Sequence, residues 1–409
     1  MNTEKILEEL YSYSMFGIKL GLENIERMCE ALGNPQDRYR VIHIAGTNGK
    51  GSTATTIEAG LIEAGYRVGK FTSPHIIHFN ERIQLNGEEI SDQDICSYYL
   101  KVKELVEKNM IKATFFEMTT AMMFLYFADK NAEFVVLETG MGGRYDATNV
   151  VNSEIAVITN VTLDHVGFLG DNIYDISKEK AGIIKNGSKV IVGDNNQDFI
   201  RAISVETENF VNIKSKYKNV DYILDKEKFV TDIKIGNKRY FFSLFGEYQV
   251  VNFLCAYETL KMLGIEDEII QKAAQKVRWP GRFEVYSRTP LVILDGAHNT
   301  DAAEKLKENL NLLFSPDEVV TIVSVLEDKD IKSIMKEIRG FSDTVIFTSL
   351  KMFKRGLKGE ELMKYSDSFK LCVVENDVKT AYEKAIFMKK RVIVVCGSFY
   401  LLSRFKQEA

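Results

Sequence analysis

Residues 41–52 read VIHIAGTNGKGS, and this stretch decides how the first half of the chain folds. The β-branched, apolar run at its start predicts a buried strand. The run breaks at Gly46 into a glycine-rich loop, and a helix-compatible stretch, TATTIEAGLIEAG, follows. Strand, glycine loop and helix form the context of a phosphate-binding loop, in which backbone N–H groups and the helix N-terminus attract an anion. In such a loop Lys50 reaches the outer phosphates and Ser52 binds Mg²⁺.

The loop departs from the usual phosphate-binding pattern, which is Gly, four residues, then Gly-Lys-Ser/Thr. Its first glycine stands only three residues before Gly49, and Gly51 separates the lysine from the serine. The alternative interpretation is a glycine-rich turn that carries one solvated lysine. The strand and helix on either side favour phosphate binding.

The composition is that of an ordinary globular protein. The chain has 409 residues, 45% hydrophobic and 27% charged, which is enough for two or three domains. A net charge of −5 without a long basic run argues against nucleic acid as a partner. Five scattered cysteines without a C-x-x-C pair argue for a reducing compartment and against a zinc site. The N-terminus lacks a signal-peptide core and no stretch is long enough to span a membrane, so we expect a cytoplasmic protein.

Strands and helices are expected to alternate on both sides of a central segment that has a different pattern. Up to about residue 192, apolar runs followed by helical stretches indicate a parallel sheet. Residues 215–245 alternate in hydrophobicity, which predicts antiparallel strands with a turn at Gly236-Asn237. From about residue 288 the alternation restarts, with strands expected at 291–295, 319–324, 344–348, 370–374 and 391–396.

The predicted fold class is therefore α/β: a P-loop parallel-sheet ATPase domain with a small antiparallel β segment, followed by a smaller Rossmann-like α/β domain. We expect an N-terminal domain over residues 1–287 and a C-terminal domain over residues 288–409. A linker near residues 284–290, which ends at Pro290, is expected to act as a hinge between them.

Polar residues follow several expected strands near the glycine loop. Ser73, Glu138 and His165 each stand at the end of such a strand, and parallel strands present their C-terminal ends at one edge of a sheet. Mg²⁺ prefers oxygen ligands and usually keeps phosphates in its shell, so Ser52, Ser73 and Glu138 are candidate ligands. His165 is a less typical Mg²⁺ ligand and indicates a second metal position.

Each of these residues, taken alone, also has a structural explanation. Glu138 can be a solvated carboxylate, and a single histidine such as His165 is more often a hydrogen-bonded structural residue. Lys180, beside Lys178 and Glu179 on an expected helix, is predicted to be a solvated charge. Glu138 and His165 both lie beside the glycine loop, which favours a role as metal ligands. No physical feature of the sequence favours such a role for Lys180.

Eight motifs, in this order along the chain, resemble those of folylpolyglutamate synthases and the related dihydrofolate synthases of the Mur ligase superfamily. They are GTNGKGS, TSPH-x-x-x-FNERI, ETGMGGR-x-DATN, LDH-x-x-x-LG, KEKAGI, PGRFE, DGAHN and GSFYL. GTNGKG[ST] is shared across the superfamily, whereas SPH…NER and GGR-x-DATN are much more specific to the folate branch. The resemblance implies an ATP-dependent ligase that joins L-glutamate to a folate or pteroate carboxylate through an acyl phosphate. Such enzymes extend folates to polyglutamates, and bifunctional members also make dihydrofolate from dihydropteroate.

The resemblance also implies roles for individual residues. The positions that match ATP contacts are Thr47, Asn48, Gly49, Lys50, Gly51, Ser52, Asn252, Arg282 and Asp295. The positions that match metal ligands are Ser52, Ser73, Glu138, His165 and Lys180, of which the lysine is carbamylated in the family. The implied catalytic residues are Lys50, Lys180 and His165. The pterin-binding positions of bifunctional members match Lys19, Leu20, Gly21, Thr114, Phe115, Phe116, Glu117, Tyr145, Asp146 and Ala147, and positions near the incoming glutamate match His298 and Ser398.

The implied cofactors are ATP and two Mg²⁺ ions, and the implied partners are the small-molecule substrates ATP, L-glutamate and a folate or dihydropteroate. We expect a monomer that binds neither nucleic acid nor membranes. Two positions depart from the family pattern: Lys19 stands where Asp is frequent, and Tyr145 stands where an aliphatic residue is frequent. These departures leave the preferred pterin substrate open and do not affect the ligase core.

Two other interpretations compete with this one. A ligase that adds an amino acid to a nucleotide-linked cell-wall precursor shares GTNGKG[ST], but it should lack SPH…NER and usually carries an extra N-terminal domain. The roughly forty residues before the loop are too few for that domain. A nucleotide-dependent switch needs the loop but not Arg282, His298 and a second domain facing the loop, and it would show no glutamate-dependent release of ADP.

Overall fold

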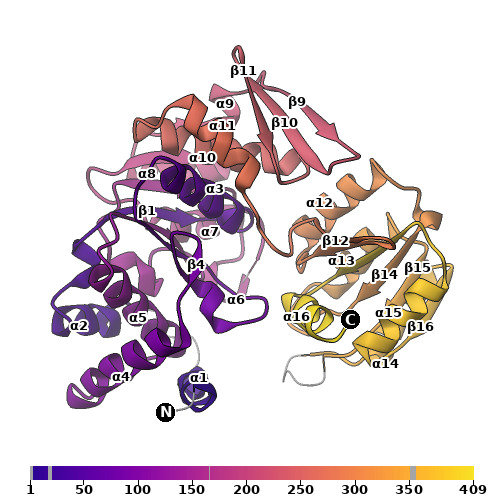
Figure 1. The fold of residues 1–409 in the computed structure, drawn as a ribbon, viewed down its shortest axis with the longest axis horizontal. Coiled ribbons are helices and arrows are strands. Elements are labelled where there is room, and N and C mark those ends of the chain that lie inside the picture. The colour runs from indigo at the N-terminus through magenta and orange to yellow at the C-terminus, as the bar shows by residue number, and fades with distance from the viewer. Residues whose placement is uncertain (1–2, 17–20, 165, 351–355) are drawn as a thin grey trace.

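The computed structural model of the protein describes residues 3–16, 21–164, 166–350 and 356–409. Within these ranges the chain forms three β-sheets, which belong to two α/β units and a small antiparallel sheet attached to the first unit (Figure 1). Among the helices of the described ranges, none has both the length and the apolar character that crossing a membrane requires.

The first sheet has eight strands in the order β4-β3-β2-β5-β1-β6-β7-β8. Its strands from β2 to β8 are parallel, and β3 and β4 add antiparallel pairs at one edge. The hairpin between β3 and β4 turns at Asn86-Gly87, as the sequence predicts. The strands are β1 (Arg40–Ala45), β2 (Val68–Phe71), β3 (Ile83–Leu85), β4 (Glu88–Glu89), β5 (Phe134–Glu138), β6 (Ile155–Ile158), β7 (Lys189–Val192) and β8 (Val211–Asn212).

Helices cover both faces of this sheet, so its strands are apolar on both sides. Along β5, Val135 and Leu137 pack into one cluster, whereas Phe134 and Val136 pack into another on the opposite face. Parallel strands buried on both faces read as continuous apolar runs, which is why the sequence reveals them. The helices of this unit are α1 (Thr3–Ser12), α2 (Glu23–Ala31), α3 (Lys50–Glu63), α4 (Asp92–Lys108), α5 (Phe115–Asp129), α6 (Val166–Leu169), α7 (Ile173–Ala181), α8 (Gln197–Glu206), α9 (Ile213–Lys216), α10 (Glu247–Met262) and α11 (Asp267–Lys276).

The small antiparallel sheet confirms the prediction for residues 215–245. Its strands are β9 (Asp221–Asp225), β10 (Val230–Ile235) and β11 (Lys238–Phe242), and β10 pairs with both others. Gly236 and Asn237 connect β10 to β11, as expected. One face of the sheet packs through Ile233, Tyr240 and Phe242 into the same cluster as α3 and α10.

The second α/β unit is built on a six-stranded sheet in the order β12-β13-β17-β14-β15-β16, parallel except for β12. All five strands expected from the sequence are present. The strands are β12 (Glu284–Arg288), β13 (Leu291–Asp295), β14 (Val319–Val323), β15 (Thr344–Phe347), β16 (Leu371–Val374) and β17 (Val392–Cys396). The helices are α12 (Thr300–Asn311), α13 (Ile331–Arg339), α14 (Gly359–Leu362), α15 (Val378–Phe387) and α16 (Phe399–Glu408). Short 3-10 helices connect elements of both units: η1 (Tyr13–Phe16), η2 (Pro35–Asp37), η3 (Phe79–Arg82), η4 (Ala147–Val150), η5 (Pro316–Glu318) and η6 (Met363–Ser368).

The prediction of a hinge over residues 284–290 is wrong. Residues 284–288 form strand β12, which pairs antiparallel with β13, and Thr289-Pro290 lies in the turn between the two strands. The alternating pattern of an edge strand was mistaken for a linker because a proline follows it, but a proline in a turn forfeits no ladder hydrogen bond. The chain instead crosses between the units through residues 277–283, and the expected boundary between residues 287 and 288 passes through β12.

Candidate active site

The glycine loop lies where strand β1 meets helix α3, as the sequence predicts. Gly49 has a φ of +83° and precedes the helix directly. A Cβ at this position would collide with the side-chain amide of Asn252, a residue of α10. Only glycine combines this backbone angle with such a close neighbour, so the loop requires Gly49 on two independent grounds.

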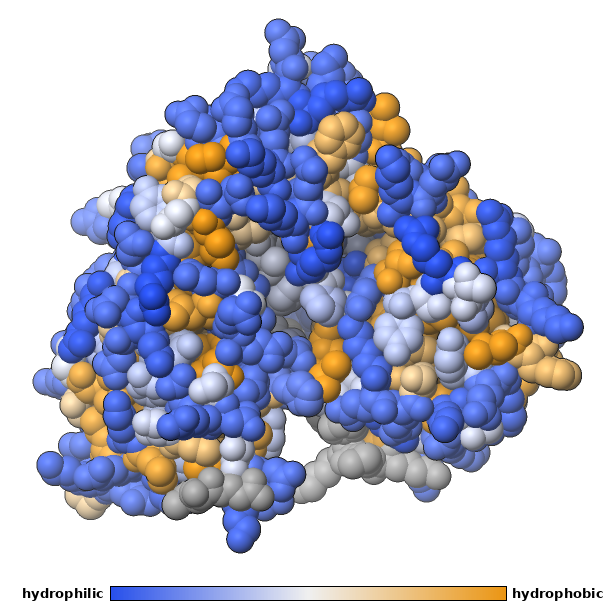
Figure 2. Space-filling view, viewed as in Figure 1, coloured by the Kyte–Doolittle hydropathy of each residue, from blue (hydrophilic) through white to orange (hydrophobic). Residues whose placement is uncertain are grey.

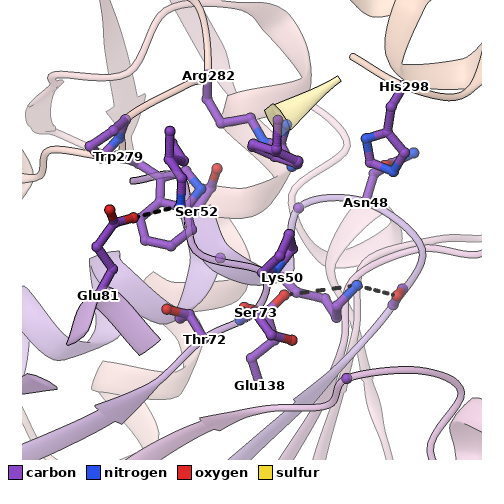
Figure 3. A pocket seen from close by; sticks show the side chains of 18 of the residues that line it. Asn48, Lys50, Ser52, Thr72, Ser73, Glu81, Glu138, Trp279, Arg282 and His298 are labelled. Carbon is purple, nitrogen blue, oxygen red and sulfur yellow. Dashed lines mark hydrogen bonds and ion pairs between the residues drawn. The ribbon is translucent and has the colours of Figure 1, made fainter. Parts of the chain in front are cut away.

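The Lys50 ammonium lies over the loop (Figure 3) and lines a pocket of about 350 Å³ between the two units, where Figure 2 shows the surface hollowed. It donates hydrogen bonds to the carbonyl oxygens of Gly46 (2.9 Å) and Thr47 (3.2 Å). Its Nζ is also 3.8 Å from Oε1 of Glu138, the last residue of β5. A lysine ammonium over a glycine loop at the start of a helix is the arrangement that binds the phosphates of a nucleotide.

The unusual Gly51 is explained by a residue from the crossing between the units. A Cβ on Gly51 would collide with the indole ring of Trp279, which also lines the pocket. Behind the indole lies a buried ion pair: Lys70 Nζ is 2.5 Å from Oε2 of Glu58, and both side chains are 4% exposed. The same ammonium lies 5.6 Å from the centre of the indole ring. No local pattern predicts this ion pair, because its partners come from a strand and a helix.

The candidate metal ligands that the structure describes gather on one side of this pocket. Ser52, Ser73 and Glu138 all line it, and the Ser73 N–H donates to Oε2 of Glu138 (3.3 Å). Burial raises the pKa of Glu138, and the nearby Lys50 opposes this shift. His165 lies outside the described residues. Two hydroxyls and a carboxylate facing a phosphate loop are oxygen donors, and such a set fits Mg²⁺. Within the described residues no group of three or more His, Cys, Asp or Glu side chains is placed to hold a metal ion.

Lys180 is not the solvated charge that its sequence neighbours suggest. Its side chain on α7 is 4% exposed and lines the same pocket. In the described part of the chain it forms neither a hydrogen bond nor an ion pair. Burial, reinforced by the positive charge of Lys50, lowers the pKa of Lys180 to about 7. About half of a lysine with this pKa is a neutral amine at pH 7.

A second pocket, of about 560 Å³, adjoins the first. The expected pterin-binding residues that the structure describes all line it: Gly21, Thr114, Phe115, Phe116, Glu117, Tyr145, Asp146 and Ala147. Lys19 and Leu20 lie outside the described residues. The two pockets share a wall, which consists of Ser73, Pro74, Gly140, Met141, His298 and Phe399.

Three of the polar residues in the second pocket are also used to shape its wall. Thr114 caps α5, and Oε2 of Glu117 accepts a hydrogen bond from the Thr114 N–H (2.7 Å). Asp146 accepts from the N–H groups of Met141 (2.8 Å) and Thr148 (3.0 Å). These bonds hold the two loops that frame the pocket in place.

The second α/β unit contributes a different set of groups. Arg282 lines the first pocket, and its guanidinium lies 4.7 Å from the centre of the Phe399 ring. Asp295 is buried and accepts from the N–H groups of Phe283 and Ala297, both at 2.8 Å. Neither Asp295 nor Asn252 is among the residues that line the two pockets. Phe399, which separates the pockets, was missed as a site residue, although it stands in the GSFYL motif.

Of the two residues expected near the incoming glutamate, His298 lines both pockets and Ser398 lines the second. Nδ1 of His298 lies 2.8 Å from the carbonyl oxygen of Gly296, which can only accept, so Nδ1 carries the proton. Burial lowers the pKa of His298 to about 4. The ring is therefore neutral at physiological pH, and its Nε2 has a lone pair available. Ser398 caps α16 and accepts from the N–H of Tyr400 (3.1 Å).

Contacts across the pocket join the two units directly. Asn48, in the glycine loop, donates to Oδ2 of Asp301 on α12 (2.7 Å). Lys329 forms an ion pair with Asp164 at 3.2 Å, and Asn299 donates to the other oxygen of that carboxylate at 3.3 Å. The nucleotide loop and the edge of the second unit are thus in direct polar contact.

Comparison with known proteins identifies the family. The Mur ligase middle domain matches residues 44–260, and the Mur ligase, glutamate ligase domain matches residues 281–399. A dihydrofolate synthase/folylpolyglutamate synthase of Bacillus subtilis is 34% identical over 96% of this chain and 95% of its own length. A dihydrofolate synthetase of Saccharomyces cerevisiae is 33% identical over 94% of this chain and 96% of its own.

Solved structures agree with this result. Escherichia coli FolC in complex with DHPP and ADP has a TM-score of 0.88 at 27% identity and covers 98% of this chain and 97% of its own. A bifunctional folylpolyglutamate synthase/dihydrofolate synthase of Yersinia pestis, complexed with AMPPNP and Mn, has a TM-score of 0.87 at 29% identity and covers 100% and 98%. The chain therefore belongs to the Mur ligase family, within the group of the dihydrofolate synthases and folylpolyglutamate synthases.

Proposed function

We propose that this ATP-dependent ligase, which adds glutamate to folates, works through an acyl phosphate formed across the shared wall of the two pockets. A carboxylate oxygen of the folate or pteroate attacks the γ-phosphorus of ATP, the bond to the bridging oxygen breaks, and ADP leaves. The amine of glutamate then attacks the acyl carbon, inorganic phosphate leaves, and the nitrogen loses a proton as the amide forms. The observation that supports this order is the junction itself, where a phosphate-loop pocket and an aromatic pocket meet at Ser73, Pro74, Gly140, Met141, His298 and Phe399.

The nucleotide half of the reaction needs positioning and charge cancellation more than covalent help. The loop from Gly49 to Ser52 supplies N–H groups at the start of α3, whereas the N–H groups of Thr47 and Asn48 already donate to Asn160. Lys50 exchanges its loop carbonyls for phosphate oxygens. Arg282 closes the opposite side of the pocket, where Figure 3 shows it above the loop. We assign Asn252 and Asp295 to the support of this site, because Asn252 packs on Gly49 and Asp295 holds the backbone next to Arg282.

The oxygen donors Ser52, Ser73 and Glu138, together with His165, would hold the divalent cations, which we propose to be two Mg²⁺ ions. Such a cation supplies charge neutralisation for the transferring phosphoryl group. Lys180 can join these ligands only if its side chain carries a negative charge, since an ammonium would repel a cation. We therefore propose that Lys180 is carbamylated: its neutral amine adds to CO₂, a nitrogen–carbon bond forms, and one proton is released.

The acceptor half places the amine of glutamate against His298. With its proton fixed on Nδ1, the neutral ring offers Nε2 as an acceptor for the ammonium or amine hydrogens of the substrate. Ser398, at the N-terminus of α16, lines the same pocket. On the folate side, Phe115 and Phe116 line the second pocket with aromatic surface suited to a flat heterocycle. We propose that both dihydropteroate and reduced folates are accepted.

One experiment tests the proposal. The protein is incubated with ATP, Mg²⁺ and L-glutamate, with dihydropteroate or tetrahydrofolate whose carboxylate carries ¹⁸O. We expect ADP release that depends on glutamate, a product heavier by one glutamyl group, and one ¹⁸O atom in the inorganic phosphate. Amide product without ¹⁸O in phosphate would exclude the acyl phosphate, and ADP release that ignores glutamate would exclude the ligase.

We further propose that the chain acts as a monomer of two domains, joined by residues 277–283, in the cytoplasm. All five cysteines are free, which suits a reducing compartment. Light scattering on a size-exclusion column tests the monomer, and a mass near twice 46.6 kDa would contradict it.

A further inference from the structure

The loop between strand β2 and helix η3, residues 72–78, forms part of both pockets. Ser73 and Pro74 belong to the shared wall, and Ser73 is one of the candidate metal ligands. The side chain of Glu81, which stands in η3 just after this loop, also lines the first pocket (Figure 3). None of the proposed reaction steps uses this carboxylate, so its contacts require another explanation.

The Glu81 carboxylate accepts three hydrogen bonds from the backbone of the loop. Its Oε2 accepts from the N–H of Ile76 (2.7 Å), and its Oε1 accepts from the N–H groups of Ile77 (2.6 Å) and His78 (2.8 Å). A capping box at the start of η3 accounts for the bond to His78 alone. The other two bonds reach back into the loop, and bonds to a charged acceptor are stronger than those between neutral groups. Glu81 therefore fixes the conformation of the loop itself.

The same loop reaches the second α/β unit through Ile76. This side chain packs against an apolar cluster of that unit, which includes Leu401 and Leu402 of α16. A Cβ on Gly281, in the crossing between the units, would lie 3.1 Å from Cδ1 of Ile76 and 3.0 Å from Cδ1 of Leu402. The loop, the crossing and α16 thus meet at one point, which is only three residues from Ser73 in the sequence.

Ser73 is held from the side of the first unit. Its N–H donates to Oε2 of Glu138, at the end of β5 (3.3 Å). Only two residues separate Ser73 from Ile76, and one of them, His75, accepts at Nδ1 from Nε of Arg82 (2.8 Å). Because the backbone has only two soft dihedral angles per residue, so short a segment carries a displacement of Ile76 to Ser73.

We propose that Glu81 is a positioning residue, which clamps this loop so that Ile76 rests on the second unit while Ser73 faces the metal position. This inference rests on the proposed function, because the metal role of Ser73 is part of it. With the clamp intact, the seating of the second unit and the position of a metal ligand are set together. Glu81 acts on the reaction through Ser73 and takes no part in the bond-forming steps.

The first test measures amide hydrogen exchange by mass spectrometry, without nucleotide or metal. Glu81→Gln keeps the shape of the side chain but puts an NH₂ donor where an oxygen accepted, so at least one loop N–H loses its partner. Glu88→Gln, on the exposed strand β4, is the matched control. A hydrogen bond to a charged group is worth about 10- to 100-fold in an equilibrium. We expect residues 76–78 to exchange faster by about that factor in Glu81→Gln and at the normal rate in Glu88→Gln.

The second test measures the metal site. Mn²⁺ binding in the presence of a non-hydrolysable ATP analogue is followed by electron paramagnetic resonance. Glu81→Gln and Ile76→Ala should each weaken Mn²⁺ binding by about 10-fold, and kcat with Mg²⁺ should fall while the KM for folate stays the same. Because both substitutions act through Ser73, the double variant should lose little more than the weaker-binding single variant. Glu81→Asp, which keeps the charge, should retain part of the binding.

The outcomes separate this inference from the proposed function. Normal exchange at residues 76–78, or normal Mn²⁺ binding, in Glu81→Gln overturns this inference alone. Losses that simply add in the double variant also overturn it, since Glu81 and Ile76 then act separately. If Glu81→Gln fails to fold, Glu81→Asp and Ile76→Ala take its place in the same measurements. Unaltered protein that shows no glutamate-dependent ADP release overturns the proposed function as well.

Discussion

Replacing Lys180 by alanine tests whether this residue is a carbamate or an ordinary ammonium. Lys178, an exposed lysine on the same helix, provides the control. Lys178→Ala also deletes one lysine side chain, but at a position that faces solvent. If the carbamate supplies oxygen ligands for the metal, Lys180→Ala should lose most of its turnover while ATP binding changes little. Added bicarbonate or a short carboxylate should restore part of the activity by occupying the vacated position.

The size of the effect follows from the environment of the lysine. With a pKa of about 7, roughly three quarters of Lys180 is neutral at pH 7.5, against about one in a thousand for an ordinary lysine with a pKa of 10.5. Only the neutral amine adds to CO₂. Because the pKa is lowered, the neutral fraction falls only about tenfold between pH 8 and pH 6, whereas an ordinary lysine would lose about a hundredfold. Carbamylation should therefore be site-selective near neutral pH and fade below it.

The assay is carbon NMR of the protein in ¹³C-bicarbonate at a fixed CO₂ concentration. The unaltered protein and Lys178→Ala should show one carbamate signal that Lys180→Ala lacks, and the signal should weaken as the pH falls from 8 to 6. A signal that survives Lys180→Ala, or full ligase activity in that variant, would refute the reasoning.

Two other substitutions probe the phosphate loop and its support. Lys50→Ala should lower turnover by about 10³-fold or more with little change in folding, because the lysine cancels charge on the transferring phosphoryl group; near-normal steady-state turnover would remove the loop assignment. Lys70→Met should cost about 3–5 kcal/mol in urea denaturation, since it leaves Glu58 buried without its partner. The double variant Lys70→Met with Glu58→Gln should recover most of that loss. If the losses in unfolding free energy of the two single variants simply add in the double variant, the two charges are not paired.

The elements of the fold that the sequence predicts best are those with a local cause. The strand at residues 41–45, the glycine loop and the five strands of the second unit all follow from apolar runs bounded by turns. The turn at Gly236-Asn237 follows from residues that favour it. Strand β12 was misjudged as a linker, because its half-polar edge pattern and the following proline look the same in either structure.

The parts of the site that the sequence leaves undetermined depend on contacts between distant segments. Lys180 has charged neighbours in the sequence, and the local sequence does not predict that this lysine is buried. The ion pairs of Lys70 with Glu58 and of Lys329 with Asp164 each join different elements, so neither has a sequence spacing to reveal it. Most of the predicted metal-binding and substrate-binding residues came from the resemblance to known enzymes. Physical patterns in the sequence indicate only some of them.

The position of Trp279 against Gly51 gives the protein a built-in optical probe. The chain contains one tryptophan, and this residue lies on the segment that joins the two units while its ring covers the first turn of the nucleotide-binding helix. Its emission therefore reports a single place, and no other indole contributes background. A shift of this linker relative to the glycine loop would change the polarity around the ring and so the wavelength of its fluorescence, in the unlabelled protein and during turnover.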